Sequence, residues 1–317
     1  MIPVIDLGGF VDGSVDRHEA IGDAVDLACR EAGFFQVVGH GVDPALIRDL
    51  HLAAIAFFDL PLEDRLTVAM PEPGYPYGYS SLQGEALNRS LGGETAPDLK
   101  ETFNVGPIDA PPRPLQAMDD LDERAVYSPN LWPAMLPTLR PAVEAYYHAM
   151  ADLSTTLMAA FAVALGLPDD AFSGYIDRHG SALRLAHYPD LGVESSAEGL
   201  RAGAHTDYGT LTILWTDGAP GLQAEANDGR WIDVEPVEGG LIVNIGDLMQ
   251  RWTNDRWRST MHRVLPNGGG RRLSIPFFHN ANWDARIECI VTDDAPARYE
   301  PTTAGHHLME KFRSTVM

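Results

Sequence analysis

The spacing of apolar residues in the first half of the chain predicts helices. Residues 17–32, 43–58 and 138–165 carry apolar side chains at three- and four-residue steps, which places them on one face of a helix. Gly33 ends the first of these helices, and the apolar run Phe34–Val38 that follows is typical of a buried strand. The pattern is strongest over 138–165, so we interpret that helix as part of the core rather than as a binding surface.

The part of the chain after Gly180 has a different pattern. Short β-rich runs alternate there with turns, which predicts an antiparallel sandwich or barrel. The predicted strands are Ala182–Tyr188, Leu211–Trp215, Leu222–Ala224, Trp231–Val234, Leu241–Ile245, His262–Leu265, Leu273–Phe278 and Glu288–Val291. Together with the helices, these strands predict a mainly β fold with flanking helices.

Neither a low-complexity tract nor a Ser/Gly linker divides the chain, so we expect a single domain over residues 1–317. Within it we expect a mostly helical N-terminal part with long loops over 1–180, a β core over 181–290 and a C-terminal tail over 291–317. The region 70–135 is rich in Pro and Gly, and loops of this length in a compact domain are usually functional or mobile.

Residues 70–93 are a candidate cover for a pocket. They contain five glycines together with Tyr75, Tyr77 and Tyr79. One hypothesis is a mobile segment whose rings close over an apolar ligand. The alternative is an ordered loop whose tyrosines pack on the sheet, and the sequence does not decide between the two. After this segment, Glu101–Val105 predicts a short strand.

The charge and cysteine content narrow the range of partners and compartments. A formal net charge of −22 repels phosphate backbones, so we expect no nucleic-acid partner, and an anionic ligand would need local cations. Cys29 and Cys289 are too few for a disulfide framework, and we expect both to be buried free thiols. With neither a signal-peptide pattern nor a long apolar stretch, we expect a cytoplasmic protein without a membrane partner. Its oligomeric state is not readable from the sequence.

The triplet His205-Thr206-Asp207 is a candidate metal site. Residues two apart in an extended chain point to the same face, so one imidazole and one carboxylate could bind one ion. His262 is the candidate third ligand. Two histidines and one carboxylate on one face form the facial triad of non-haem Fe(II) oxygenases, which leaves positions open for other ligands. The alternative interpretation of the triplet is a His–Asp hydrogen bond at the start of a strand.

Arg272 and Ser274 follow His262 at a distance that adjacent strands can bring together. A guanidinium binds a carboxylate through two parallel hydrogen bonds, and a serine hydroxyl can add another. Arg272 is therefore a candidate local cation for an anionic ligand. The alternative is that Arg272 pairs with one of the 45 acidic side chains of the chain.

Several motifs then occur in an order that resembles a known family. These motifs are Pro3–Leu7 (PVIDL), Ala32–Phe35 with Gly39–Val42, Leu183–Pro189 (LRLAHYP), Ala204–Thr212 (AHTDYGTLT), Val243–Asn254 (VNIGDLMQRWTN), Ser259–Val264 (STMHRV) and Arg272–Phe278 (RLSIPFF). The chain resembles the isopenicillin N synthase-like branch of the 2-oxoglutarate/Fe(II) oxygenases. That branch includes plant hormone and flavonoid oxygenases and the bacterial ethylene-forming enzyme.

This resemblance implies a double-stranded β-helix, the jelly-roll form of the sandwich, with residues 181–290 carrying the iron site. It implies iron on His205, Asp207 and His262. It also implies that Arg272 and Ser274 hold the distal carboxylate of 2-oxoglutarate.

The resemblance also bears on the rest of the pocket. Tyr188 matches a tyrosine that often helps to bind the cosubstrate, and its alternative role is core packing. Tyr208 and Phe278 match positions that line the active site of the ethylene-forming enzyme, and we add Asn104 and Tyr79 as candidate substrate-pocket residues.

Other residues of these motifs have structural interpretations. We expect His40 to fix a turn, Asn244 and Asp247 to hold backbone turns, and Trp252 to lie in the core. One departure is Ala186, because many plant members carry Asn at this position.

The resulting prediction is an Fe(II)-dependent oxidoreductase that uses O2 and 2-oxoglutarate and releases succinate and CO2. Its substrate would be a small organic molecule, and hydroxylation, desaturation and cyclisation all remain open. The first alternative is an oxidase of the same fold that does not use 2-oxoglutarate. A non-catalytic jelly-roll binding module and a zinc hydrolase are further alternatives.

Overall fold

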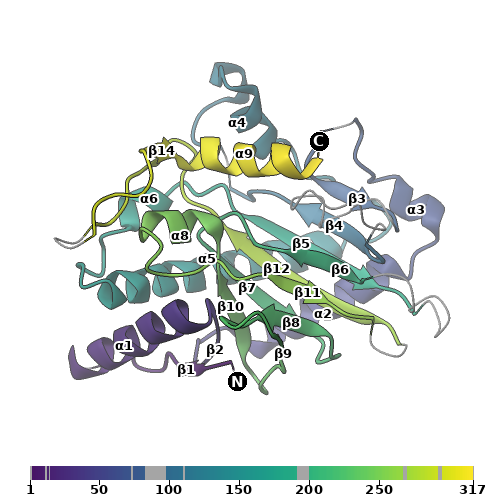
Figure 1. Ribbon diagram of the computed structural model, residues 1–317. Helices are drawn as coiled ribbons and strands as arrows, with labels where there is room; N and C mark the ends of the chain where they lie inside the picture. The colour runs from purple at the N-terminus through teal and green to yellow at the C-terminus, as the bar shows by residue number, and fades with distance from the viewer. Residues whose placement is uncertain are drawn as a thin grey trace.

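Two β-sheets lie at the centre of the protein, and helices flank the larger sheet (Figure 1). The computed structural model describes residues 2–10, 13, 15–72, 74–82, 98–109, 111–190, 200–266, 270–291 and 295–316. The predicted mainly β fold with flanking helices is confirmed. None of the helices in these ranges is long and apolar enough to cross a membrane.

The larger sheet has eight strands, and only its β1–β2 pair is parallel. Its order is β1 (Val4–Asp6), β2 (Phe34–Val38), β10 (Leu241–Ile245), β7 (Leu211–Thr216), β12 (Arg272–His279), β5 (Ala182–Tyr188), β4 (Glu101–Val105) and β3 (Gly78–Ser80). The first four strands of the chain therefore lie in the same sheet as strands from the second half. Within the N-terminal 180 residues, β2 and β4 are the strands predicted from the sequence, whereas β3 was not predicted.

The smaller sheet has four strands in the order β6 (Ala202–His205), β11 (His262–Val264), β8 (Leu222–Glu225) and β9 (Trp231–Asp233). A cluster of buried apolar side chains contains residues of both sheets, including Phe34, Ile242 and Val264. We call the face of the larger sheet that shares this cluster its inner face. The inner face and the smaller sheet enclose the space in which the candidate metal ligands lie.

The opposite face of the larger sheet packs against helices. The predicted helices are α1 (Val15–Glu31), α2 (Pro44–Phe58) and α5 (Leu139–Ala164). α5 contacts β12 and β7, while α1 and α2 pack on α5. The apolar stripe of α5 is buried in the main core, which confirms its interpretation as a core helix. Burial of each large apolar side chain contributes roughly 1.5–3 kcal/mol, so this layer supplies much of the folding free energy.

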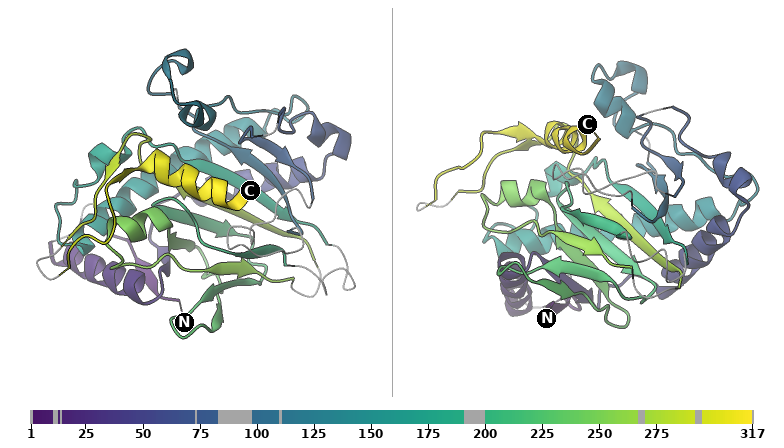
Figure 2. Two further views of the ribbon diagram at one scale, coloured as in Figure 1. Left: turned by 45° about the horizontal axis from the view of Figure 1, so that its top comes forward. Right: turned by 45° about the vertical axis from the view of Figure 1, so that its right-hand side comes forward.

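Several elements differ from the sequence prediction. The strand predicted at Glu288–Val291 is wrong, because the strand of this region is β13 (Arg286–Ile287), which pairs with β14 (Thr302–Thr303). The predicted C-terminal tail contains helix α9 (Ala304–Val316). The helices that were not predicted are α3 (Leu62–Leu66), η2 (Leu115–Ala117), α4 (Leu121–Val126), α6 (Ser173–Ile176) and α8 (Asp247–Trp252). α9 lies beside α8 and α4 across one side of the molecule (Figure 2).

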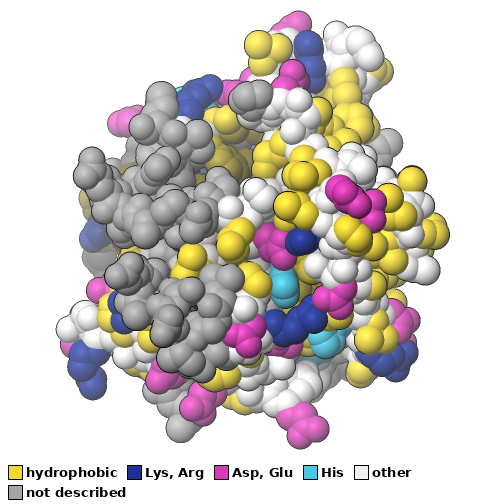
Figure 3. Space-filling model, turned by 90° about the vertical axis from the view of Figure 1, so that its right-hand side faces the viewer, with side chains coloured by type: hydrophobic (Ala, Val, Ile, Leu, Met, Phe, Trp, Pro, Cys, Tyr) yellow, Lys and Arg dark blue, Asp and Glu magenta, His cyan; other side chains and the backbone are white. Residues whose placement is uncertain are grey.

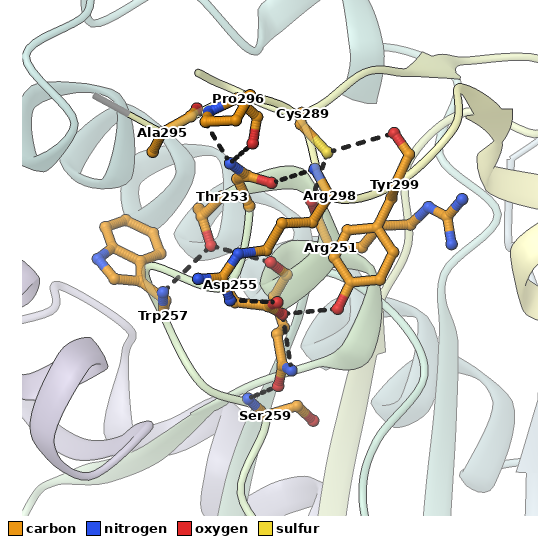
Figure 4. Close-up of polar contacts among 12 residues, drawn as sticks. Arg251, Thr253, Asp255, Trp257, Ser259, Cys289, Ala295, Pro296, Arg298 and Tyr299 are labelled. Atoms are coloured by element: carbon orange, nitrogen blue, oxygen red, sulfur yellow. Dashed lines mark hydrogen bonds and ion pairs between the residues drawn. The ribbon is translucent and has the colours of Figure 1, made fainter. Parts of the chain in front are cut away.

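A network of polar contacts, which we call the C-terminal clamp, fixes the segment that leads to α9 (Figure 4). The clamp consists of Asn254, Asp255, Pro296, Arg298 and Tyr299. The Asn254 amide donates to the carbonyl of Pro296 (3.0 Å), and the backbone N–H of Arg298 donates to Asn254 Oδ1 (2.8 Å). Asp255 accepts from the Tyr299 hydroxyl (2.7 Å) and pairs with Arg298 (3.0 Å). This part of the C-terminal region is therefore anchored rather than a loose tail.

The three tyrosines of the 70–93 segment pack on the scaffold. Tyr77 and Tyr79 are buried, and the hydroxyls of Tyr75 and Tyr77 donate to the carbonyls of Pro129 and Val126. These contacts favour the ordered-loop interpretation for this part of the segment. Residues 83–97 lie outside the described residues, so the hypothesis of a cover is not decided for them.

Two smaller expectations concern cysteines and turns. Cys29 is buried, as expected, whereas Cys289 is only partly buried; both are free thiols. His40 accepts from the backbone N–H of Val42 (3.2 Å) and contacts the carbonyl of Gly239 (3.0 Å), so it fixes its turn as predicted. Trp252 lies in the core.

Candidate active site

His205, Asp207 and His262 come together in the structure. One ligand atom from each lies within 4.8 Å of the other two. His205 and His262 are direct partners across β6 and β11, with ring centroids 4.3 Å apart. Asp207 Oδ1 lies 3.9 Å from Nε2 of His205 and 3.8 Å from Nε2 of His262. His205 and Asp207 are two residues apart, and strand pairing sets His262 opposite His205. Together these relationships bring the three ligand atoms to one point.

Hydrogen bonds fix the orientation of both imidazoles. Nδ1 of His205 contacts the carbonyl of Gly203 at 2.7 Å, and Nδ1 of His262 contacts the carbonyl of Thr260 at 3.1 Å. A carbonyl only accepts, so each Nδ1 carries the proton and each Nε2 has an available lone pair. Both Nε2 atoms face Asp207.

The Asp207 carboxylate is fixed through its other oxygen. Oδ2 accepts from the Thr212 hydroxyl (2.6 Å) and from the Asn244 amide (2.7 Å), which leaves Oδ1 toward the histidines. Asn244 was expected to hold a backbone turn, but its side chain instead contacts a candidate metal ligand directly. Two imidazoles and one carboxylate oxygen on one side of a point are the donor set that suits Fe(II) with open positions.

The protonation states agree with this arrangement. Burial, together with the neighbouring His262, lowers the pKa of His205 to about 3, so its ring is neutral at ordinary pH. Burial alone would raise the pKa of Asp207. The two histidines and the hydrogen bonds from Thr212 and Asn244 outweigh that effect and hold the pKa of Asp207 below its usual value.

Backbone contacts with the start of α8 hold the loop after His205. The N–H of Asp247 donates to the carbonyl of Asp207 (2.8 Å), and the N–H of Gly246 donates to that of Thr210 (3.0 Å). A Cβ atom on Gly246 would lie 2.1 Å from the Gly209 carbonyl oxygen, so this approach requires glycine. Asp247 also accepts from the hydroxyl of Thr206 (3.2 Å), consistent with its expected structural role.

Arg272 lies on the inner face and is only 1% exposed. Its guanidinium lies over the ring of Tyr188, 4.9 Å from the centroid, and its Nε donates weakly to the carbonyl of Ala219 (3.4 Å). Nη1 is shut off from solvent and has no hydrogen-bond partner, and no acidic side chain among the described residues pairs with Arg272. The alternative of a pairing with an acidic side chain is therefore not observed in this part of the chain.

The candidate substrate-pocket residues fall into three places. Asn104 and Phe278 are joined by Arg184, which donates to Asn104 Oδ1 (2.7 Å) and lies 5.8 Å from the centroid of Phe278. Arg184 was not predicted as a pocket residue, although its spacing of four residues from Tyr188 on one strand places both on one face. Tyr208 meets Phe312 of α9, with ring centroids 5.5 Å apart.

Tyr79 is a correction to the predicted pocket. It pairs with Phe103 in the sheet and packs on Phe57, in the main core on the helix-covered side. Its hydroxyl donates to Glu101 (2.5 Å). Asn104 is the next residue after Phe103 and points to the other face, so Tyr79 does not share its pocket.

On the side of the molecule that faces right in Figure 1, histidine, acidic and basic side chains gather in a hollow (Figure 3).

Two family models match the chain. Residues 2–135 match the model described as non-haem dioxygenase in morphine synthesis N-terminal, and residues 179–281 match the 2OG-Fe(II) oxygenase superfamily. A 2-oxoglutarate-Fe(II) type oxidoreductase from Aspergillus fumigatus is 33% identical, with 99% of this chain and 93% of that protein covered. A homoarginine-6-hydroxylase from Oryza sativa subsp. japonica is 34% identical, with 98% and 96% covered.

Solved structures give the same result. A full-length Neurospora crassa protein, solved in complex with alpha-KG, has a TM-score of 0.86 and 30% identity over 99% of this chain and 96% of its own. A 2OG-Fe(II) oxygenase family protein from Caulobacter crescentus has a TM-score of 0.83 and 29% identity, with 98% of each chain covered.

The chain belongs to the 2-oxoglutarate/Fe(II) oxygenase family. Within this family it is a 2-oxoglutarate-dependent dioxygenase, an oxidoreductase that uses Fe(II), 2-oxoglutarate and O2. The alternative of an oxidase that does not use 2-oxoglutarate is not favoured by these relatives.

Proposed function

We propose that His205, Asp207 and His262 hold the Fe(II) ion of this dioxygenase. The observation that carries the proposal is the convergence of three ligand atoms within 4.8 Å, each presented by a side chain whose other polar atom is already hydrogen-bonded. When bound, Fe(II) supplies the activation of O2, with electrons from the oxidative decarboxylation of 2-oxoglutarate. The protein supplies the ligand geometry, the orientation of substrate and the exclusion of water.

We further propose that Arg272 and Ser274 bind the distal carboxylate of 2-oxoglutarate. The enclosed and unpartnered Nη1 of Arg272 supports this role, because a buried guanidinium nitrogen without a partner suits an anionic ligand. Ser274 is buried two residues further along β12 and so shares the inner face. The ring of Tyr188 packs on the guanidinium and orients it.

The substrate we propose is a small organic molecule that binds near Asn104, Phe278 and Tyr208. The guanidinium of Arg184 links the first two of these residues, and a cationic group over an aromatic ring gives this part of the pocket both polar and apolar character. Relatives that are named for such substrates include the homoarginine-6-hydroxylase and a validamycin A dioxygenase from Streptomyces hygroscopicus subsp. limoneus.

We also propose a fold type, a domain organisation and a compartment for the protein. We infer that the two sheets form a double-stranded β-helix, or jelly roll, within a single domain that spans the chain. The mixing of N-terminal and C-terminal strands in one sheet supports a single folding unit. The two free thiols support a reducing compartment, and we infer the cytoplasm.

The test of the iron site measures Fe(II) binding and release of succinate from 2-oxoglutarate. His205→Ala and Asp207→Ala should lose most metal binding and all succinate release while they retain the fold, because each removes one of three ligands. His306→Ala changes an exposed histidine and serves as the matched control. Full iron occupancy in the first two variants would contradict the assignment.

A further inference from the structure

Four side chains form one row across the inner face of the larger sheet. Thr102 on β4 pairs with Ala186 on β5, Ala186 pairs with Ser274 on β12, and Ser274 pairs with Thr216 on β7. Directly opposed residues in antiparallel strands place their side chains on the same face, about 4.5–5.5 Å apart at Cβ. Ser274 therefore has an apolar methyl group on one side and a threonine on the other.

Thr216 lies on the inner face together with the metal-site residues. Thr212 is four residues earlier on β7, so it points to the same face, and its hydroxyl donates to Asp207. Leu214, between them on that face, packs on the apolar cluster shared by the two sheets. The Thr216 side chain is thus turned toward the space between the sheets rather than toward the helices.

The hydroxyl of Thr216 is shut off from solvent and has no hydrogen-bond partner among the described residues. Nη1 of Arg272, two residues from Ser274 on the same face of β12, has the same property. Nearly all buried polar atoms in proteins have partners, so these two unpartnered atoms, one across from Ser274 and one two residues along its own strand, require an explanation. Both can donate a hydrogen bond, and a carboxylate can accept from a hydroxyl and a guanidinium together.

We propose that Thr216 is a third donor to the distal carboxylate of 2-oxoglutarate, beside Arg272 and Ser274. The inference rests on the proposed cosubstrate site. A carboxylate offers about four lone-pair positions, so it can accept from all three side chains at once. Ala186 offers no polar side-chain atom on the other side of Ser274, which orients the carboxylate toward β7.

The test is a calorimetric titration of 2-oxoglutarate into the Mn(II)-loaded protein without O2, so that the readout is binding rather than turnover. Thr216→Val keeps the shape but removes the hydroxyl, and it should raise the dissociation constant about tenfold. Thr216→Ser keeps the hydroxyl and should restore tight binding. Thr102→Val is the matched control, because Thr102 lies in the same row beyond Ala186 and its hydroxyl accepts from Asn104 (3.5 Å); it should leave the dissociation constant unchanged.

A second ligand identifies which end of the cosubstrate is involved. In 2-oxovalerate a methyl group replaces the distal carboxylate, so Thr216→Val should not weaken its binding. The thermal midpoint of the ligand-free Thr216→Val protein should stay equal or rise, because a buried hydroxyl without a partner is removed.

The outcomes of these measurements distinguish a failure of the role of Thr216 from a failure of the cosubstrate site. Unchanged 2-oxoglutarate binding by Thr216→Val overturns the inference, as does an equal loss with 2-oxovalerate or a lower thermal midpoint. Failure of the unaltered protein to prefer 2-oxoglutarate over 2-oxovalerate would instead overturn the cosubstrate site itself.

Discussion

The side-chain amide of Asn244 donates a 2.7 Å hydrogen bond to Oδ2 of Asp207, so the carboxylate can turn only one oxygen toward the histidines. The Thr212 hydroxyl adds a second bond to the same oxygen. A carboxylate held in this way binds a metal through Oδ1 alone and leaves a coordination position for another ligand. Asn244 and Thr212 are thus positioning residues for the proposed iron site.

Removal of this amide should weaken metal binding. Asn244→Leu keeps a similar volume but removes the donor, so Asp207 becomes free to rotate. We expect Fe(II) affinity to fall by about 10–100-fold, the usual effect of losing a partner of a metal ligand. Competition with a metal indicator measures it, and Ile242→Leu, on the same strand and face, controls for repacking. Equal affinities in the two variants would show that Thr212 alone suffices.

The contrast between Asp207 and Asn244 shows what the sequence could predict. His205 and Asp207 are two residues apart, so strand alternation alone predicts that they share a face. Asn244 reaches Asp207 only because β10 pairs with β7 in the register that sets Asn244 opposite Thr212. A slip of one residue in that register would turn Asn244 to the other face of the sheet, and the pattern of β10 alone does not identify β7 as its partner strand.

The same reasoning explains the wrong assignment of Tyr79. Alternation along β3 places successive side chains on opposite faces, but it does not say which face is the inner one. That choice is set by the pairing of Tyr79 with Phe103 and by packing against Phe57 of α2. For α9 the pattern was present, since Ala304, Leu308 and Phe312 recur at four-residue steps, but we had interpreted the region as a tail.

A substitution of Arg272 tests whether 2-oxoglutarate binding needs only a positive charge or also the planar guanidinium group. Arg272→Lys keeps the positive charge but loses the planar fork and the contact with the Tyr188 ring. Loss of one charge-assisted hydrogen bond costs about 1.5–3 kcal/mol, so affinity for 2-oxoglutarate should fall by roughly one to two decades. Arg271→Lys is the control, because Arg271 is exposed and pairs with Asp59. An unchanged dissociation constant for Arg272→Lys would count against the role.

Asp26 links stability to pH. Its carboxylate accepts from the indole N–H of Trp257 (2.8 Å) and from Arg256 (3.0 Å), and it pairs with Arg30 (2.9 Å). Burial alone would raise the pKa of Asp26, but the contacts with Arg256, Trp257 and Arg30 outweigh burial and lower it. A carboxyl with a lowered pKa in the folded state stabilises the protein above its unfolded pKa of about 3.9, and this stabilisation is lost as pH falls through the folded pKa.

Asp26→Asn should therefore cost about 1–3 kcal/mol of unfolding free energy at neutral pH, with a difference from the unaltered protein that shrinks below about pH 4. Denaturant unfolding at a series of pH values measures it. Asp23→Asn, an exposed position on the same helix, should show no such pH-dependent difference. A difference for Asp26→Asn that stays constant across the series would exclude the ionised form as its source.

Two substitutions at Asn254 in the C-terminal clamp can separate the contribution of its backbone conformation to stability from that of its hydrogen bonds. Asn254 has a φ of 55°, a left-handed conformation that Asn tolerates, Gly adopts freely and other residues adopt at a cost. Asn254→Gly removes the bonds to Pro296 and Arg298 but keeps the backbone relaxed. Asn254→Ala removes the same bonds and adds about 1–2 kcal/mol of backbone strain.

We therefore expect both variants to speed hydrogen exchange at the backbone N–H of Arg298, because its acceptor Asn254 Oδ1 is absent in each. The two variants should differ from each other only in their unfolding free energies. Asn254→Ala should be less stable than Asn254→Gly by about 1 kcal/mol or more. Thermal or denaturant unfolding measures that difference, and exchange monitored by mass spectrometry measures the first effect. If Asn254→Ala were as stable as Asn254→Gly, the left-handed backbone would not be strained for alanine, and the choice of Asn would depend on the hydrogen bonds alone.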